Sequence, residues 1–193
     1  LIGTGAFDLS GAMIAIEKKM DIFGVNVLGA TTAVGGGIMR DIILGLTPPG
    51  AFSHPVYVLV AALTSTILFV IAYAKPTAFE SRVKTDYYDK LMFWCDTAGL
   101  GIFTVVGIQA VVRAVGGENV FFFVFIGTLT GVGGGVLRDI MAGETPYILV
   151  KHIYACAAIA GGIVCVVGRT AFGEAYGTIL GLAATVLLRF LAA

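Results

Sequence analysis

The sequence predicts an all-α polytopic membrane protein of seven transmembrane helices, arranged as two inverted three-helix repeats and a seventh helix. Two bulk properties predict this class. Of the 193 residues, 58% are hydrophobic and only 12% are charged, where a soluble domain carries about 25% charged residues. Each crossing needs about 20 apolar residues, so the chain has room for seven helices with short loops. We therefore expect a single transmembrane domain over residues 1–193 rather than a globular enzyme.

Apolar stretches between polar turns place the helices. Their expected ranges are 1–17, 23–46, 55–75, 91–113, 119–143, 147–168 and 174–192. Repeat one takes residues 1–75, a polar linker takes residues 76–90, repeat two takes residues 91–170, and the seventh helix takes residues 174–192. Because no signal-peptide pattern precedes the first helix, we expect that helix to remain in the membrane.

Two copies of one motif identify the repeat. Residues 29–48 align without gaps on residues 127–146, with twelve identities in twenty positions at a constant offset of 98. The centre of each copy reads Val-Gly-Gly-Gly-x-x-Arg-Asp, and an Asp-x-x-Gly pattern at Asp8 recurs at Asp96. Since each repeat holds three helices, an odd number, the second repeat enters the membrane from the opposite side.

Loop cations predict the orientation, because cytoplasmic loops are enriched in Lys and Arg. One face has only Arg113 and Arg169. The other face, expected to be cytoplasmic, collects Lys18, Lys19, Lys75, Arg82, Lys84, Lys90 and Lys151. Seven crossings then put the N-terminus outside and the C-terminus in the cytoplasm.

Six of the 27 glycines form two triplets, which are Gly35, Gly36, Gly37, Gly133, Gly134 and Gly135. A triplet costs about 3 kcal/mol of helix propensity relative to alanine. We therefore expect a kink or break at each triplet, where the backbone carbonyls of Gly35, Gly37, Gly133 and Gly135 would coordinate a monovalent cation. The alternative is close helix packing, which we expect instead for Gly173, Gly177 and Gly181 on the last helix.

Charged residues inside the predicted helices are the second functional signal. They are Asp8, Arg40, Asp41, Asp96, Arg138 and Asp139. Four acids against two bases favour cations. Adjacent residues on a helix do not face one another, so we expect the arginines to pair across helices, with Asp8 or Asp96, rather than with the next residue. The alternative is that these charges act as structural clamps near the interface.

Other side chains suggest no further chemistry. His54 and His152 occupy matching positions and are expected to cap helices rather than bind metal, with divalent-metal transport as a minor alternative. Three cysteines without C-x-x-C spacing predict neither a disulfide framework nor a zinc site. The formal net charge of zero gives no basic surface for nucleic acid.

The doubled Gly-Gly-Gly-x-x-Arg-Asp motif, the Phe7-Asp-x-x-Gly11 opening and the helix pattern of three plus three plus one resemble the prokaryotic trimeric intracellular cation (TRIC) channels. The same domain is also labelled a glycine transporter domain. The resemblance covers essentially the whole chain. It implies a homotrimer surrounded by membrane lipids, in which each protomer has a pore for potassium and sodium and needs no cofactor. It places the pore near the glycine triplets, with Asp41 and Asp139 close by.

The leading hypothesis is a passive monovalent-cation channel of a bacterial inner membrane. The alternative is a small amino-acid transporter for glycine that uses the same inverted repeats, with half-helix N-termini binding the substrate carboxylate. A purely structural scaffold fits poorly with four acids inside the membrane.

Overall fold

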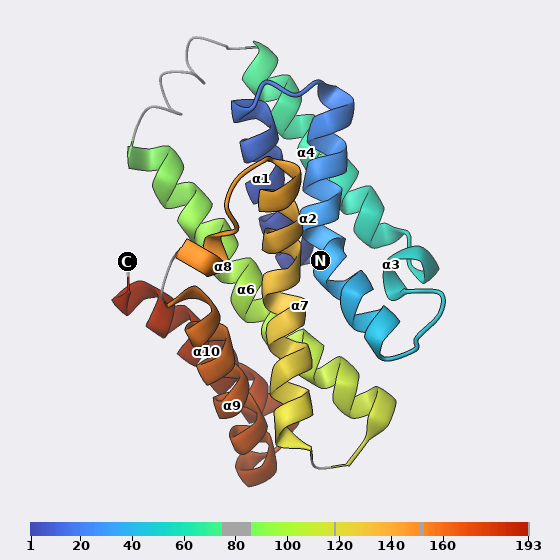
Figure 1. The fold of residues 1–193 in the computed structure, drawn as a ribbon, viewed down its shortest axis with the longest axis vertical. Helices are drawn as coiled ribbons and strands as arrows, with labels where there is room; N and C mark the ends of the chain where they lie inside the picture. Colours follow the sequence, from blue (N-terminus) through green and yellow to red (C-terminus); the bar gives the residue numbers. More distant parts are fainter. Residues whose placement is uncertain (75–85, 118, 151–152, 193) are drawn as a thin grey trace.

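The fold is that of a computed structural model, which describes residues 1–74, 86–117, 119–150 and 153–192. Within these ranges every regular element is a helix (Figure 1). The long helices are α1 (Ile2–Glu17), α2 (Ile22–Ile43), α4 (Val56–Ala74), α6 (Asp86–Val115), α7 (Val120–Met141), α9 (Tyr154–Phe172) and α10 (Glu174–Leu191). Two single-turn helices, α3 (Gly50–Ser53) and α8 (Tyr147–Val150), precede α4 and α9.

Six helices of the described chain are long and apolar enough to cross a membrane. They are α2, α4, α6, α7, α9 and α10. Helix α1, with 16 residues, is shorter than the others and than the roughly 20 residues that a crossing takes. The prediction of an all-α membrane protein is confirmed.

Helix ends differ from the predicted ones where local chemistry stops or extends a helix. Helix α6 begins at Asp86 instead of 91, so the end of the expected linker is helical, while the rest of that linker, from 75 to 85, lies outside the described residues. Helix α9 begins at Tyr154 instead of 147, because α8 takes the first of these positions as a separate turn.

Two glycines end α2 and α7 earlier than predicted. Gly45 and Gly143 have φ values of 69° and 73°, a left-handed conformation that favours glycine. Each lies one residue past the C-cap, and the next backbone N–H donates back to the carbonyl of Asp41 or Asp139, at 2.8 Å in both cases. This is the Schellman arrangement, which satisfies the last carbonyls of a helix.

The same two helices also begin alike. The side chain of Asp21 accepts a hydrogen bond from the Gly24 N–H at 2.8 Å, and that of Asn119 accepts one from the Phe122 N–H at 3.0 Å. Both are N-caps of the preferred residue types. Like the C-terminal glycines, Asp21 and Asn119 are 98 residues apart, so the matching sequence motifs form matching helices.

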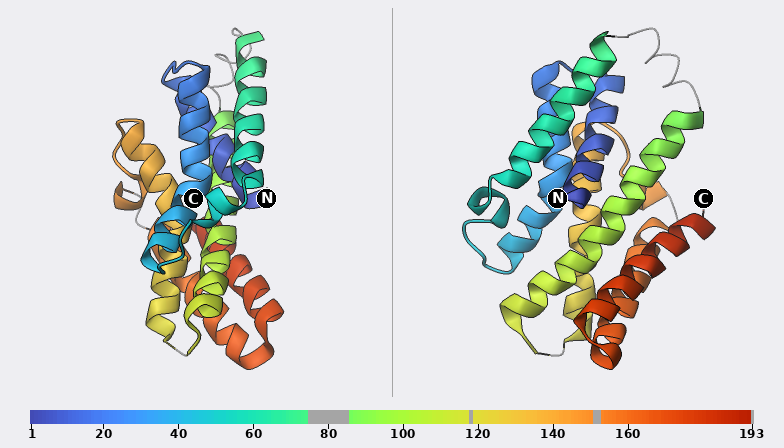
Figure 2. Two further views of the ribbon diagram at one scale, coloured as in Figure 1. Left: turned by 90° about the vertical axis from the view of Figure 1, so that its right-hand side faces the viewer. Right: turned by 180° about the vertical axis from the view of Figure 1, so that it is seen from behind.

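Helices α2 and α7 pack against each other near the middle of the molecule (Figure 1). Helices α1 and α4 pack on α2, and α6 and α9 pack on α7. The long α6 runs diagonally past both groups, and α10 lies beside α9 (right panel of Figure 2). The α2–α7 contact therefore joins the two halves.

Glycines make the contact between α9 and α10 close. A Cβ atom on Gly177 would lie 2.6 Å from the Cys165 carbonyl oxygen, and one on Gly181 would lie 2.8 Å from the Gly161 carbonyl oxygen. The packing role expected for these two residues is confirmed. The packing role expected for Gly173 is wrong, because this residue, with φ at 95°, forms the turn between α9 and α10.

Candidate functional site

Both glycine triplets lie inside continuous helices, so there is no break at either of them, while the expected alternative, a kink, stays a prediction. The middle glycines form the crossing of α2 and α7. A Cβ atom on Gly36 would run into the carbonyl oxygen of Thr130, and one on Gly134 into that of Thr32. For these two residues the packing alternative holds, because only an absent side chain lets the backbones approach so closely.

The flanking glycines have different surroundings. A Cβ atom on Gly35 would lie 2.6 Å from Leu137 Cδ1, and one on Gly133 would lie 3.2 Å from Met39 Sδ. These two glycines therefore also lie in the contact between α2 and α7. The last glycine of each triplet lies beside polar atoms instead.

Gly37 and Gly135 border the arginines that follow them. A Cβ atom on Gly37 would lie 3.9 Å from the Arg40 guanidinium. One on Gly135 would lie 3.4 Å from the Tyr154 hydroxyl, 3.8 Å from the Arg138 guanidinium and 3.9 Å from Asp96 Oδ1. Gly135 therefore adjoins a polar cluster between the helices.

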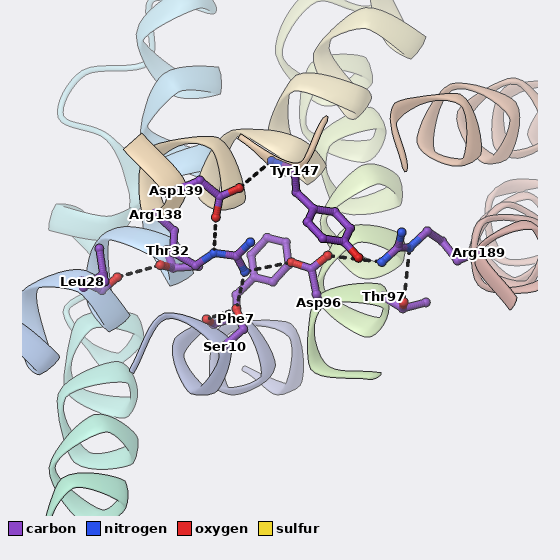
Figure 3. Close-up of polar contacts among 10 residues, drawn as sticks. All are labelled: Phe7, Ser10, Leu28, Thr32, Asp96, Thr97, Arg138, Asp139, Tyr147 and Arg189. Carbon is purple, nitrogen blue, oxygen red and sulfur yellow. Dashed lines mark hydrogen bonds and ion pairs between the residues drawn. The ribbon is translucent and has the colours of Figure 1, made fainter. Parts of the chain in front are cut away.

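Arg138 is the centre of this cluster (Figure 3). Its side chain is only 2% exposed. Its Nη1 donates to Asp96 Oδ1 at 3.0 Å and to Ser10 Oγ at 2.9 Å, and its Nε donates to Asp139 Oδ1 at 2.8 Å. These contacts join α7 to α6 and α1. Burying a guanidinium is costly unless its donors are paired, and here two carboxylates and a hydroxyl accept hydrogen bonds from Nε and Nη1.

The cross-helix pair expected between an arginine and Asp96 is confirmed, but the expectation that neighbouring Arg and Asp side chains do not pair is wrong. Arg40 Nε donates to Asp41 Oδ1 at 2.8 Å, just as Arg138 Nε donates to Asp139. Adjacent residues on a helix point in different directions, but a long side chain can bridge this separation. At the last turn of a helix, a long guanidinium reaches around to the adjacent carboxylate.

The second oxygen of each aspartate holds the chain that follows. Asp41 Oδ2 accepts from the Gly50 N–H at 2.8 Å, and Asp139 Oδ2 accepts from the Tyr147 N–H at 2.7 Å. Gly50 and Tyr147 are the first residues of α3 and α8. Each aspartate therefore links its arginine to the next helical turn, in both halves.

Asp8 has a different partner from Asp96, although the sequence motif matches them. Asp8 is fully buried, and both of its carboxylate oxygens lie within 2.9 Å of the Ser65 hydroxyl on α4. Of the two acids expected to pair with an arginine across helices, Asp96 is therefore the one that does so among the described residues. Arg40, whose side chain is 14% exposed, has Asp41 as its ion-pair partner there.

Arg189 on α10 belongs to the cluster and was missed as a site residue. Its Nη2 lies 3.6 Å from Asp96 Oδ2, and its Nε donates to Thr97 Oγ1 at 3.3 Å. The guanidinium carbon lies 4.8 Å from the ring centre of Phe93 and 4.7 Å from that of Tyr154, which are cation–π distances.

The sequence does contain a signal for this residue. Gly177, Gly181, Thr185 and Arg189 follow one another at intervals of four and are the buried residues of α10. Residues four apart lie on one helix face, so the glycine row that packs on α9 also predicts that Arg189 points inward. Ser10 carries a weaker signal, as a polar residue two positions after Asp8.

A cavity of about 520 Å³ adjoins the buried cluster. Five acids and three bases line it, together with apolar and other polar side chains. These charged residues are Glu17, Lys18, Asp89, Asp96, Arg138, Asp139, Glu144 and Arg189. The excess of acidic groups favours cations over anions in such a space.

The outer part of the cavity lies on the predicted cytoplasmic face. Lys18, in the turn after α1, pairs with Glu144, in the turn after α7. Their side chains are 39% and 52% exposed, whereas those of Arg138, Asp96, Asp139 and Arg189 are only 2–6% exposed. The hydrogen bond with Glu144 raises the pKa of the Lys18 ammonium above its ordinary value. The cavity therefore leads from exposed charges to buried ones.

Metal-binding clusters are absent from the described ranges, where no three His, Cys, Asp or Glu residues lie close enough together to hold a metal ion. His54 is exposed just after α3, and His152 lies outside the described residues. All three cysteines are free.

A family model described as "Glycine transporter" matches residues 1–73 and 93–170. The chain is also similar to the inner membrane protein YadS of Escherichia coli K12, at 36% identity over 194 residues, covering 100% of this chain and 88% of YadS. A membrane protein of Deinococcus radiodurans is 39% identical over 163 residues, covering 83% of this chain and 70% of that protein.

Solved structures of cation channels have the same fold. The TRIC trimeric intracellular cation channel orthologue from Rhodobacter sphaeroides matches with a TM-score of 0.86 and 33% identity, covering 98% of this chain and 92% of that one. A TRIC cation channel studied for the basis of its conductance matches with a TM-score of 0.82 and 35% identity, covering 99% and 89%. The chain therefore belongs to the TRIC channel family of membrane proteins, whose shared domain is described as a glycine transporter.

Proposed function

We propose that this protein is a passive monovalent-cation channel with one pore in each protomer, and that the acid-rich cavity is one entrance to that pore. The observation that carries the proposal is the continuity of this cavity with a buried cluster of charges from α6, α7 and α10. Clustered charges inside a membrane protein typically mark an ion path. The similarity to TRIC cation channels supports the same function.

Arg138 closes the inner end of the cavity in this proposal. A buried guanidinium repels a passing cation, and Arg138 is tied to Ser10 and Asp96 across the helices. At the contact of Gly36 with Thr130, the backbones of α2 and α7 leave no space between the two helices. Opening therefore requires Arg138 to leave Asp96, and the arrangement described here is the closed one.

The glycine triplets would serve opening rather than closure. Gly135 adjoins the Arg138 guanidinium, and three adjacent glycines weaken a helix locally. We propose that both triplets bend in the open state, so that carbonyls of Gly35, Gly37, Gly133 and Gly135 come to contact potassium or sodium. Asp41 and Asp139 would lie close to that path.

The membrane placement belongs to the same proposal. The chain would form one transmembrane domain, with two inverted repeats and α10, in a bacterial inner membrane, as named for YadS. Its N-terminus would be outside and its C-terminus cytoplasmic. The protomers would form a homotrimer among membrane lipids, as in the trimeric relative, which a native mass measurement in nanodiscs tests.

Single-channel recording tests the central claim. Purified protein in a planar bilayer, with a tenfold KCl gradient, is expected to give unitary currents that reverse near the potassium equilibrium potential. Reversal near the chloride potential would rule out cation selectivity. Empty bilayers and protein denatured before reconstitution are the controls.

Glycine transport is the second candidate, favoured by the description of the family domain. The cavity has both arginines and carboxylates, which are the partners that the carboxylate and ammonium of an amino acid need. Binding of the glycine carboxylate by half-helix N-termini would need a break in α2 or α7, and both helices are continuous. Saturable glycine accumulation in vesicles that carry no cation current would establish this candidate and exclude the channel.

A further inference from the structure

Asp96 lies between two arginines, and only one of them is fully engaged with it. Arg138 Nη1 donates to Oδ1 at 3.0 Å, whereas Arg189 Nη2 lies 3.6 Å from Oδ2. Oδ2 has no hydrogen-bond partner in the described chain. We propose that Arg189 is a substitute counter-ion, which takes over the charge of Asp96 when Arg138 withdraws from it. The inference deepens the proposed channel function, on which its gating part rests.

The equivalent arginine of the first half shows which contact Arg138 would keep after leaving Asp96. Arg40, 98 residues earlier, has only the adjacent Asp41 as its ion-pair partner in the described residues, at 2.8 Å from Nε. Arg138 keeps the same local pair with Asp139 and adds the contacts to Asp96 and Ser10. An Arg138 that gave up these additional contacts would have the partner that Arg40 has now.

Withdrawal of Arg138 is costly unless Asp96 finds another partner. Asp96 is only 4% exposed, and removing one member of a buried ion pair leaves an uncompensated charge that strongly destabilises the structure. Arg189 needs to move by less than about an ångström to bring Nη2 to the 2.7–2.9 Å of a charge-assisted hydrogen bond. Phe93 and Tyr154 already hold its guanidinium beside Asp96.

The first half of the chain has no such arrangement. Asp8, the counterpart of Asp96, accepts from Ser65 and has no arginine within ion-pair distance in the described part of the chain. Arg189 comes from α10, the one long helix that belongs to neither repeat. Helix α10 therefore supplies the second arginine beside Asp96.

A thermal-stability cycle tests the substitution without any need for current. The variants are Arg138→Gln, Arg189→Gln and the double variant, measured by thermal unfolding in detergent. Because either arginine alone can neutralise Asp96, we expect the double variant to lower Tm by roughly twice the sum of the single changes. In an Asp96→Asn background this excess should vanish. Additive losses in both backgrounds would overturn the proposal.

Channel recordings test the consequence for gating. Arg189→Gln removes the substitute partner, so the ratio of open to closed time is expected to fall about tenfold. Arg189→Lys keeps the positive charge and should restore most of the wild-type ratio of open to closed time. Adding Asp96→Asn to Arg189→Gln should restore opening as well, since no charge is then left unpaired. Arg113→Gln, which removes an exposed pair with Glu174, is the matched control.

The outcomes separate the two claims. A wild-type protein that conducts no cations contradicts the proposed function, while the stability cycle still decides whether Arg189 replaces Arg138. A wild-type protein that conducts, with Arg189→Gln at the unchanged or a higher open ratio, contradicts the substitute role of Arg189 in gating and leaves the channel function standing.

Discussion

Equivalent residues of the two halves have different environments, and the difference arises from single side chains. Arg40 and Arg138 make the same bond to the following aspartate at 2.8 Å. In the part of the chain that the structure describes, only Arg138 of these two has a buried carboxylate on a neighbouring helix and a serine hydroxyl, that of Ser10, as partners. In the other half, the Ser65 hydroxyl donates a hydrogen bond to the Asp8 carboxylate. A hydroxyl in one half thus replaces a guanidinium in the other.

Gly36→Ala tests the residue at which the two halves meet. Its methyl group would overlap the Thr130 carbonyl oxygen, which is part of the α7 backbone and cannot move alone. Although alanine gains about 1 kcal/mol of helix propensity, we expect a net loss of roughly 1–3 kcal/mol in the free energy of unfolding. Denaturant unfolding in detergent measures this.

The matched control for this substitution is Gly5→Ala in α1. Outside the backbone of its own helix, a Cβ atom on Gly5 would have no heavy atom of the described residues within 4 Å, so this variant should be neutral or slightly more stable. Equal stability of the two variants would mean that α2 and α7 separate easily and that their contact does not depend on Gly36.

At the scale of elements, each half uses the same start and stop chemistry, while α10 differs. Asp21 and Asn119 begin α2 and α7, and Gly45 and Gly143 end them. Helix α10 instead depends on a row of small residues against α9, and the same helix face ends in Arg189. The packing of α10 therefore positions a charge in the candidate site.

Gly181→Ala tests this dependence. Its methyl group would lie 2.8 Å from the Gly161 carbonyl oxygen and 3.0 Å from Cys165 Cα, so α10 has to move away from α9. We expect the free energy of unfolding to fall by roughly 1–3 kcal/mol. Hydrogen exchange should also become faster in both helices. Unchanged hydrogen exchange in α9 would mean that the packing of α9 on α10 does not depend on Gly181.

At the scale of the whole molecule, the cavity brings together parts of both halves and α10. Lys18 follows α1 and Glu144 follows α7, yet they form an ion pair beside the same space. Exposed apolar side chains of α4, such as Leu59, Leu63 and Ile67, are 58–63% exposed and suit contact with lipid. The charged cluster therefore lies inside the molecule, while α4 has apolar side chains on its outer face.

Orientation is tested by cysteine labelling on a background with Cys95, Cys156 and Cys165 replaced by serine. An impermeant maleimide added to intact spheroplasts is expected to label Val115→Cys, at the end of α6, and not Lys19→Cys, after α1. Permeabilised cells should show labelling at both positions, which controls for reactivity. The reverse pattern in intact cells would invert the proposed topology.

Much of the fold was predictable from the sequence, because membrane helices need long apolar runs and glycine or polar residues mark their ends. The cross-helix pair of Arg138 with Asp96 was also predictable, since a buried charge needs a partner. Helix ends were less so. The start of α9 at Tyr154 depends on the separate turn α8, whose first N–H is held by Asp139.

By itself the sequence determined the all-α membrane class, the doubled glycine motif and the set of charges to be buried, because each follows from composition or from spacing along one chain. Only the tertiary structure decided that Gly36 and Gly134 serve a helix crossing, that Asp8 binds Ser65, and that Arg189 shares Asp96 with Arg138. These contacts join residues on different helices. Their partners depend on how helices cross, and sequence periodicity does not specify a crossing.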